Sequence, residues 1–184
     1  MTASPTATGE SASSPALDRT GQRVHTVVDS PVGPLWLVAR DGVLCRLSMS
    51  DQRHAPARAQ LGERDDTALP EARTQLASYF AGELRAFDLP LYLDGTPFQR
   101  RVWAALQEIP FGQTISYGEL ATRLGAAGAS RAVGLANGRN PVAIIVPCHR
   151  VIAADGTLGG YSGGLDRKRH LLDLEQITVG HRLL

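Results

Sequence analysis

Residues 116–138 read SYGELATRLGAAGASRAVGLANG, and this stretch decides how the second half of the chain folds. Its opening serine is followed three residues later by a glutamate, the capping-box pattern at the start of a helix. Gly125 is placed to end that helix. Ser130 can cap a second helix that runs to about Asn137, with Gly138 past its end. Two short helices across a tight turn of small residues predict a helix-turn-helix.

A longer helix is predicted upstream of this pair. After Thr96-Pro97, apolar residues recur at the spacing of one helix face, at Phe98, Val102, Ala105, Leu106 and Ile109. The stretch 110–112, Pro-Phe-Gly, then ends the helix. Trp103 lies alongside this apolar face, so we expect its ring in the core rather than on a surface that stacks against bases.

Downstream, the apolar run 142–146 leads into Cys148-His149, which sets a thiol beside an imidazole. A cysteine is a strong nucleophile only as its thiolate, so a nearby base or positive charge makes it reactive. His149 and Arg150 are the neighbours that can supply either one. A small buried thiol is also ordinary packing, so the surroundings decide. They are Asn140-Pro141 before the pair, and Tyr161-Ser162-Gly163-Gly164 and Glu175 after it.

The first half of the chain reads as a small antiparallel sheet with a helix. Alternating apolar segments bounded by turn residues predict strands over 24–29, 35–39 and 43–49, and a further strand near 87–93. Between the third and the last of these, apolar residues at helical spacing predict a helix over 70–80. Asp41-Gly42, between the second and third strands, is typical of a hairpin turn. Residues 50–68 are polar and irregular, and no chemical site is evident in this half. With the helical second half, these elements predict an α+β fold.

The composition excludes several classes of protein. The chain has 184 residues and 43% hydrophobic content, so it can bury a core, and no apolar run approaches the length of a bilayer span. We therefore expect no membrane partner. Cys45 and Cys148 are the two cysteines and have no metal-ligand spacing, which favours a reducing cytoplasm over a disulfide framework. Residues 1–20 are rich in small and polar residues and predict a disordered tail rather than a secretory signal.

Charge is uneven along the chain. Residues 1–95 carry a net charge of −3, and residues 96–184 carry one of +4. A basic second half suits a polyanionic partner, but a charge of this size is also ordinary for a solvated surface. Charge alone therefore does not establish nucleic-acid binding.

Several of these motifs, in order and at compatible spacings, resemble the O6-alkylguanine-DNA alkyltransferase family, the methylated-DNA–protein-cysteine methyltransferases. The resemblance extends from about Thr96 to Glu175 and includes SYGE at 116–119, SRAVG at 130–134, IVPCHRV at 145–151 and YSGGL at 161–165. The first half matches only loosely, through SPVGPL at 30–35 and FAGEL at 80–84. The resemblance implies an N-terminal ribonuclease-H-like domain over 21–95. It also implies a mainly helical C-terminal domain over 96–184, with a winged-helix-like helix-turn-helix and an active-site loop.

The resemblance further implies direct-reversal repair of DNA. Cys148 is expected to accept the alkyl group of O6-alkylguanine, and also that of O4-alkylthymine, in a single irreversible transfer. His149 is then the base, acting through a water, and Glu175 holds its imidazole in orientation, as the third member of a triad does. Asn140 supports the local turn by hydrogen bonds, and Tyr117 donates a hydrogen bond or a proton to the departing purine.

A guanine O6 inside a duplex is out of reach of a cysteine in a pocket, so the nucleotide must leave the base stack. The resemblance gives Arg131 the task of filling the vacated space, with the second helix of the pair in the minor groove. The residues expected at the substrate are Tyr117, Val151, Tyr161 and Ser162, and those expected at the DNA are Tyr117, Gly118, Arg131, Ala132 and Gly134.

The resemblance implies no cofactor. Animal members of the family hold a structural zinc through Cys and His ligands in the first domain, and Cys45 alone cannot reproduce that site, so we expect no metal. We expect a monomer that binds duplex DNA containing O6-alkylguanine, with cooperative assembly on DNA left open. One alternative is a non-catalytic alkyltransferase-like lesion-binding protein, which lacks the acceptor cysteine that Cys148 supplies here. A cysteine hydrolase is another, but a thioether has no easy hydrolytic exit.

Overall fold

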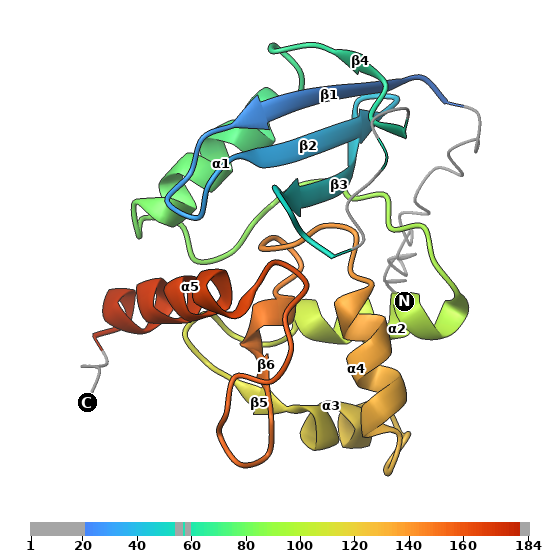
Figure 1. Cartoon of the computed structure of the whole chain (residues 1–184), viewed down its shortest axis with the longest axis vertical. Coiled ribbons are helices and arrows are strands. Elements are labelled where there is room, and N and C mark those ends of the chain that lie inside the picture. The colour runs from blue at the N-terminus through green and yellow to red at the C-terminus, as the bar shows by residue number, and fades with distance from the viewer. Residues whose placement is uncertain (1–20, 54–56, 58–59, 181–184) are drawn as a thin grey trace, which may run out of the picture.

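The computed structural model describes residues 21–53, 57 and 60–180, and the tail expected over 1–20 lies outside them. We call residues 21–95 the sheet half and residues 96–180 the helical half. Figure 1 shows the sheet and helix α1 together in the first, and the remaining helices gathered in the second. The α+β class predicted from the sequence is confirmed. No helix in the described ranges is long and apolar enough to cross a bilayer.

The sheet has the strand order β3-β2-β1-β4. Strands β1 (Arg23–Val28), β2 (Leu35–Arg40) and β3 (Val43–Met49) pair antiparallel, which confirms the three predicted strands. Asp41-Gly42 joins β2 to β3 with φ values of 50° and 79°, as a two-residue hairpin turn requires. The short strand β4 (Glu63–Arg64) pairs parallel with β1. It has no counterpart in the sequence prediction, because two exposed charged residues carry no strand pattern.

Helix α1 (Pro70–Phe80) lies against the sheet, with the bounds that the sequence predicts. Its residues Leu76 and Tyr79 are buried. The strand predicted near 87–93 is wrong, because Leu91 forms only an isolated bridge, to Leu44. Pro90 has no backbone N–H to donate to a ladder, so the pairing does not extend beyond this bridge.

The helical half contains α2 (Pro97–Gln107), β5 (Ile115–Ser116), α3 (Tyr117–Arg123), α4 (Ser130–Gly138), β6 (Val151–Ile152) and α5 (Leu165–Thr178). Helices α3 and α4 form the predicted helix-turn-helix. Ser116 and Glu119 make the predicted capping box. Trp103 is buried as expected, and its indole N–H donates to the carbonyl of Ala136 (2.9 Å).

Helix α4 differs from the prediction at both ends. Ser130 is its first residue rather than its N-cap, which is Ala129. Gly128 takes a φ of 86° and so turns the chain one position earlier than expected. At the other end, Gly138 is the last helical residue instead of the first one beyond. The C-cap is Arg139, with a φ of −96°, so the helix ends without a left-handed glycine.

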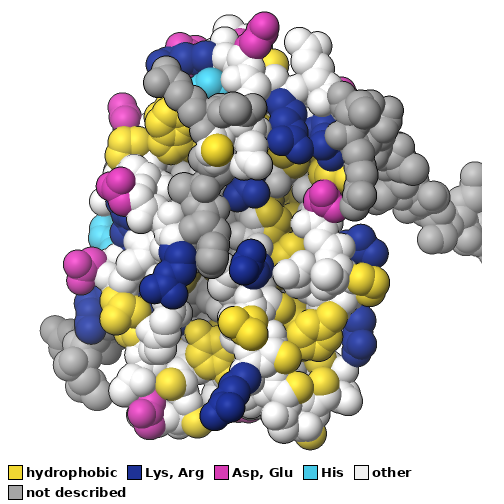
Figure 2. Space-filling model, turned by 45° about the vertical axis from the view of Figure 1, so that its right-hand side comes forward, with side chains coloured by type: hydrophobic (Ala, Val, Ile, Leu, Met, Phe, Trp, Pro, Cys, Tyr) yellow, Lys and Arg dark blue, Asp and Glu magenta, His cyan; other side chains and the backbone are white. Residues whose placement is uncertain are grey.

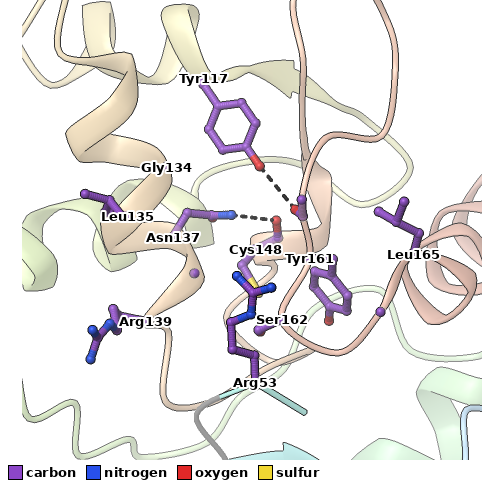
Figure 3. A pocket seen from close by; sticks show the side chains of 13 residues that line it. Arg53, Tyr117, Gly134, Leu135, Asn137, Arg139, Cys148, Tyr161, Ser162 and Leu165 are labelled. Carbon is purple, nitrogen blue, oxygen red and sulfur yellow. Dashed lines mark hydrogen bonds between the residues drawn. The ribbon is translucent and has the colours of Figure 1, made fainter. Parts of the chain in front are cut away.

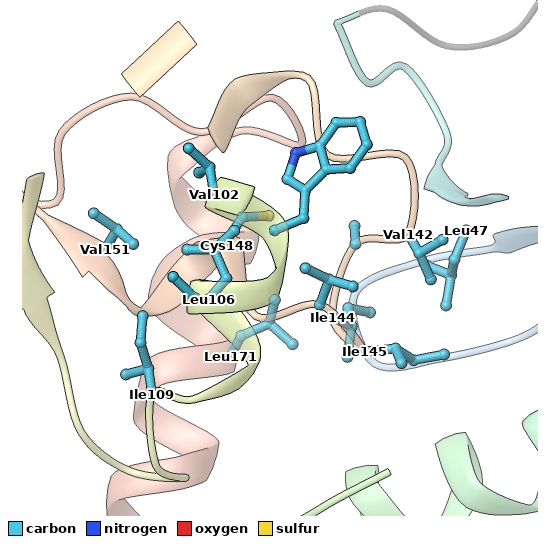
Figure 4. Packing of buried hydrophobic residues seen from close by; sticks show 14 of the residues in the cluster. Leu47, Val102, Leu106, Ile109, Val142, Ile144, Ile145, Cys148, Val151 and Leu171 are labelled. Atoms are coloured by element: carbon cyan, nitrogen blue, oxygen red, sulfur yellow. The ribbon is translucent and has the colours of Figure 1, made fainter. Parts of the chain in front are cut away.

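The two halves share one hydrophobic core, part of which Figure 4 shows. The segment after α4 runs beside β3, where the N–H of Leu47 donates to the carbonyl of Pro141 (3.0 Å) and the N–H of Ala143 donates to the carbonyl of Leu47 (3.1 Å). Buried Ile144 takes a φ of 72°, which costs a β-branched residue on the order of 1–3 kcal/mol and persists only where packing demands it. Contacts from both halves therefore fix the chain that leads into Cys148.

Candidate active site

Cys148 lies at the floor of a cavity of about 710 Å³ between α4, the start of α3 and the loop that precedes α5 (Figure 3). It begins the short 3-10 turn Cys148–Arg150, and only 2% of its surface is exposed. The described residues that line the cavity are Arg53, Tyr117, Gly134, Leu135, Asn137, Gly138, Arg139, Cys148, Gly160, Tyr161, Ser162, Gly164 and Leu165. A thiol so placed can react only with a group that enters the cavity.

His149, the residue that follows Cys148 in the chain, forms a fully buried pair with Glu175. The imidazole Nε2 lies 2.8 Å from the carboxylate Oε1 of Glu175. An ionised carboxylate only accepts hydrogen bonds, so Nε2 carries the proton and Nδ1 is the basic nitrogen. Within the described ranges, Nδ1 has no hydrogen-bond partner. Burial lowers the pKa of His149 more than Glu175 raises it, so the ring is neutral and can accept a proton.

Glu175 collects hydrogen bonds from several elements. Arg150 donates to it through Nε (2.9 Å) and Nη2 (3.0 Å), the hydroxyl of Tyr79 donates at 2.9 Å, and the N–H of Gly112 at 3.0 Å. Burial raises the pKa of Glu175, but the hydrogen bonds from His149 and Arg150 and the positive charge of Arg150 outweigh it and lower the pKa to about 2. The carboxylate, on α5, is therefore ionised at neutral pH and is held in place from α1, the loop after α2 and the 3-10 turn.

The Cys148 thiol is protonated in the free protein. Burial raises its pKa, while the Asn140 side chain and the charge of Lys168 oppose this effect without cancelling it. Lys168 is itself buried on α5, and its Nζ donates to the carbonyls of Val151 (2.6 Å) and Leu158. Burial lowers the pKa of Lys168 to about 8, so it is still mostly a cation at neutral pH. The thiol must therefore give its proton to a base during a reaction.

Two buried asparagines hold the turn that carries Cys148. Nδ2 of Asn140 donates to the carbonyl of Val146 (2.7 Å), and its Oδ1 accepts from the N–H of Val142 (3.0 Å). Asn137, near the end of α4, donates to the carbonyl of Cys148 (3.3 Å). The backbone of the cysteine is thus tied directly to the second helix of the helix-turn-helix.

Tyr117, Tyr161 and Ser162 stand around the mouth of the cavity (Figure 3). Tyr117 is the first residue of α3, and its hydroxyl donates to the carbonyl of Gly160 (3.4 Å). Burial, and then the nearby Cys148, raise the pKa of Tyr117, so its phenol keeps its proton. The same two causes raise the pKa of Tyr161 well above its ordinary value. Both phenols are therefore hydrogen-bond donors at neutral pH.

The remaining predicted residues lie in three different environments: buried, exposed on the helix-turn-helix, or lining the cavity. Val151 is buried at the start of β6 and does not appear among the described residues that line the cavity. Gly118, Arg131 and Ala132 are exposed on the helix-turn-helix, whereas Gly134 lines the cavity beside the Tyr117 ring. The residues predicted for DNA contact thus lie on the two helices that border the cavity.

Sequence reasoning missed the residues that support this site. Arg150 does not serve the thiol, because its guanidinium is bound to Glu175 and to the carbonyl of Ile109 (2.6 Å). Tyr79 lies on a distant helix and gives no sequence signal. Lys168 belongs to the basic run 167–169, which is typical of a solvated face. The sequence does indicate that Lys168 is buried, because it lies seven residues from Glu175 and therefore on the same face of the helix.

Elsewhere in the described ranges, no group of three or more His, Cys, Asp or Glu side chains is arranged to hold a metal ion. Cys45 is half-buried in β3, and its thiol donates to the carbonyl of Val38 (3.3 Å). Burial raises the pKa of Cys45. Cys45 is therefore a protonated, unreactive thiol at neutral pH.

Comparisons with known proteins match both halves of the chain to the same kind of protein. The family model described as the DNA binding domain of 6-O-methylguanine DNA methyltransferase matches residues 97–177, and that described as its ribonuclease-like domain matches residues 24–93. The methylated-DNA–protein-cysteine methyltransferase of Mycolicibacterium paratuberculosis is 59% identical over 152 residues, which cover 83% of this chain and 92% of that one. That of Methanosarcina acetivorans is 48% identical over 82% of this chain and 97% of its own. Among solved structures, Mycobacterium tuberculosis OGT in complex with DNA matches with a TM-score of 0.82 at 55% identity, covering 84% of this chain and 94% of that one.

Proposed function

The chain belongs to the 6-O-methylguanine DNA methyltransferase family, and from that membership we infer that it repairs DNA by direct reversal. It is a methylated-DNA–protein-cysteine methyltransferase, which transfers the alkyl group of O6-alkylguanine in duplex DNA to its own cysteine and acts once. One observation carries this conclusion. A buried thiol, Cys148, lies at the floor of a cavity bordered by a helix-turn-helix, and the next residue in the chain, His149, has a neutral, buried imidazole.

We propose that Cys148 is the acceptor and His149 the base. The thiol proton passes through a water to Nδ1 of His149, and Glu175 stabilises the imidazolium that forms. The sulfur then attacks the alkyl carbon on guanine O6. The C–S bond forms as the C–O bond breaks, and the electron pair stays on the oxygen. Tyr117 donates a hydrogen bond to the purine as this charge develops, and the guanine ring ends with the proton that the thiol lost.

The remaining pocket residues position the base in this proposal. Tyr161 and Ser162 border the flipped base, the backbone of Val151 reads its edge, and Asn140 fixes the turn that aims the sulfur. The hydrogen bonds of Asn140 and the place of Tyr161 and Ser162 in the cavity lining support these roles. O4-alkylthymine presents the same alkyl-oxygen bond on an aromatic ring, so we propose it as a second substrate.

We propose that α4 enters the minor groove and that Arg131, at its start, fills the space of the flipped nucleotide. Unstacking a base costs a few kcal/mol, part of which an inserted side chain offsets. Gly118, Ala132 and Gly134 allow the DNA backbone to approach closely, because they carry little or no side chain. The exposure of Arg131 and Ala132, and the position of Gly134 at the cavity, support this arrangement.

We also propose that residues 21–95 and 96–184 are two domains, and that the protein works as a monomer in the cytoplasm. Separate family models over 24–93 and 97–177 support the division. Two free cysteines, with no disulfide between them, fit a reducing compartment. Non-catalytic lesion-binding relatives lack the acceptor cysteine that this chain has. A hydrolase would need to release its product from the cysteine, whereas a thioether is stable to hydrolysis.

Mass spectrometry tests the function directly. The protein is incubated with an excess of duplex that carries one O6-methylguanine, and we expect one methyl group per chain, on the peptide containing Cys148. Repaired DNA should stop accumulating when it equals the protein. The Cys148→Ser variant should bind the duplex and accept nothing. Repeated turnover, or a methyl group on another residue, would contradict the proposal.

A further inference from the structure

The cavity above Cys148 is positively charged. Among the described residues that line it, Arg53 and Arg139 are charged, and none is Asp or Glu. Figure 2 shows Lys and Arg side chains interspersed with hydrophobic ones on the face of the molecule that it displays. A methyl group offers no negative charge for a cation on the cavity wall to bind, and Lys168 already supplies the buried positive charge that favours the thiolate. The two arginines therefore need separate explanations.

The two arginines lie on opposite walls of the cavity (Figure 3). Arg139 caps the end of α4, and its guanidinium points away from Cys148. Arg53 comes from the sheet half, after β3, and lines the cavity together with Cys148 and Ser162. Arg139 is thus on the side of the DNA-binding helix, where phosphates lie. Arg53 is on the side of the acceptor sulfur.

The backbone of Arg53 is held in place although its side chain is exposed. Its N–H donates to the carbonyl of Ser162 in the loop that borders the cavity (2.9 Å). A second bridge lies beside the first, where Nη1 of Arg167 donates both to the carbonyl of Ser50 (2.7 Å) and to that of Gly163 (3.1 Å). The segment that carries Arg53 and the loop that carries Ser162 are therefore joined twice.

The geometry of transfer decides which part of a lesion meets Arg53. The sulfur attacks the carbon on O6 from the side opposite the departing oxygen, so larger substituents extend sideways into the space around the thiol. Arg53 and Ser162 border that space. A guanidinium binds a carboxylate through paired, charge-assisted hydrogen bonds, which an alkyl group without charge cannot form.

We propose that Arg53 makes the acceptor site selective for O6-alkyl groups that carry a carboxylate, of which carboxymethyl is the simplest. This inference rests on the proposed function. The Cys148 thiolate attacks the methylene carbon, the C–S bond forms, and the C–O bond breaks with its electron pair left on guanine O6. The ring regains the proton that the thiol lost, and the carboxylate stays on the thioether beside Arg53. Because the arginine is exposed, the preference is modest, about three- to tenfold in rate.

Single-turnover rates on three duplexes of one sequence test the proposal. The lesions are O6-methylguanine, O6-carboxymethylguanine and O6-carbamoylmethylguanine, the last of which matches the carboxymethyl group in size without its charge. We expect the ratio of carboxymethyl to carbamoylmethyl rates to fall about three- to tenfold in Arg53→Gln. Arg139→Gln, the matched control from the opposite wall, should keep the wild-type ratio. Added salt should reduce the wild-type ratio, because it screens an exposed ion pair.

Two outcomes overturn the inference. One is that Arg53→Gln leaves all three rates, and so their ratio, unchanged. The other is a uniform slowing of all three substrates in that variant, which would make Arg53 a phosphate contact of the same kind as Arg139. Failure of the proposed function looks different, because the wild-type protein would then transfer no methyl group from O6-methylguanine.

Discussion

The buried cluster around Glu175 and the exposed surface of α3 and α4 are built in opposite ways. In the cluster, Glu175 accepts hydrogen bonds from His149 and Arg150, and all three side chains are buried. On the helix pair, Arg131 is exposed and Leu135 exposes 74% of its surface. Transfer at one sulfur atom needs partners in fixed positions, whereas a surface that meets DNA of any sequence needs side chains free to adapt. Changes in the cluster should therefore reduce stability as well as the transfer rate, whereas changes on the surface should weaken DNA binding or base flipping and leave stability intact.

The largest effect is expected from Glu175→Ala. The variant leaves Arg150 and His149 buried without their carboxylate, and removing one partner of a buried ion pair costs about 3–5 kcal/mol. Asp166→Ala, an exposed change on the same helix, should shift stability by no more than about 0.5 kcal/mol. Urea unfolding followed by circular dichroism measures both. Equal shifts in the two variants would remove the distinction between cluster and surface.

Lowering the pH should destabilise the buried cluster through protonation of Glu175. The pKa of Glu175 is about 2 in the fold against an ordinary value of 4.5. A depressed carboxyl pKa stabilises the fold above the ordinary value, and that contribution is lost as pH falls toward the folded value, up to roughly 3 kcal/mol in all. Wild-type stability should therefore decline between about pH 5 and pH 2, and Glu175→Gln should decline less. Parallel curves for the two proteins would contradict the prediction.

Arg131→Ala should leave stability intact and slow repair of duplex DNA about 5- to 30-fold, because the flipped base loses roughly 1–2 kcal/mol of support. Reaction with free O6-benzylguanine, which needs no flipping, should stay near the wild-type rate. Arg123→Ala, on the exposed side of α3, is the control for loss of one positive charge. If the duplex and free-base rates fall together in Arg131→Ala, Arg131 supports the fold rather than the DNA.

The smallest expected effect concerns salt. Binding to undamaged duplexes of unrelated sequence should be nearly equal and should weaken as salt rises, because phosphates supply most contacts. Arg139→Gln should reduce the slope of log affinity against log salt by about one. Arg64→Gln should leave it unchanged, since Arg64 is exposed in the sheet half and paired with Asp66. Strong preference for one undamaged sequence would argue for a sequence-reading protein instead.

The features that the sequence predicted correctly are those that depend on interactions between residues close in the chain. The Asp41-Gly42 turn and the capping box at Ser116 carry their signals within a few residues, and the structure has both. The bond from Tyr79 to Glu175 joins residues 96 apart, and no local pattern announces it. Lys168 was missed for another reason, because a cation in a basic run is ordinarily solvated and here its ammonium group is satisfied by carbonyls that only the folded loop brings near. The supporting contacts of the site belong to the tertiary structure.

The long separation of Tyr79 and Glu175 also bears on synthesis. At about 5–20 residues per second, a ribosome needs on the order of 5–20 s to make the 96 residues between them. Cys148 and His149 are made late in that interval, and only over the last 26 residues does the growing polypeptide hold both without the carboxylate that orients His149. The cysteine therefore emerges as an ordinary thiol. The acceptor of a protein that acts only once thus gains its oriented base only when most of the chain has been made.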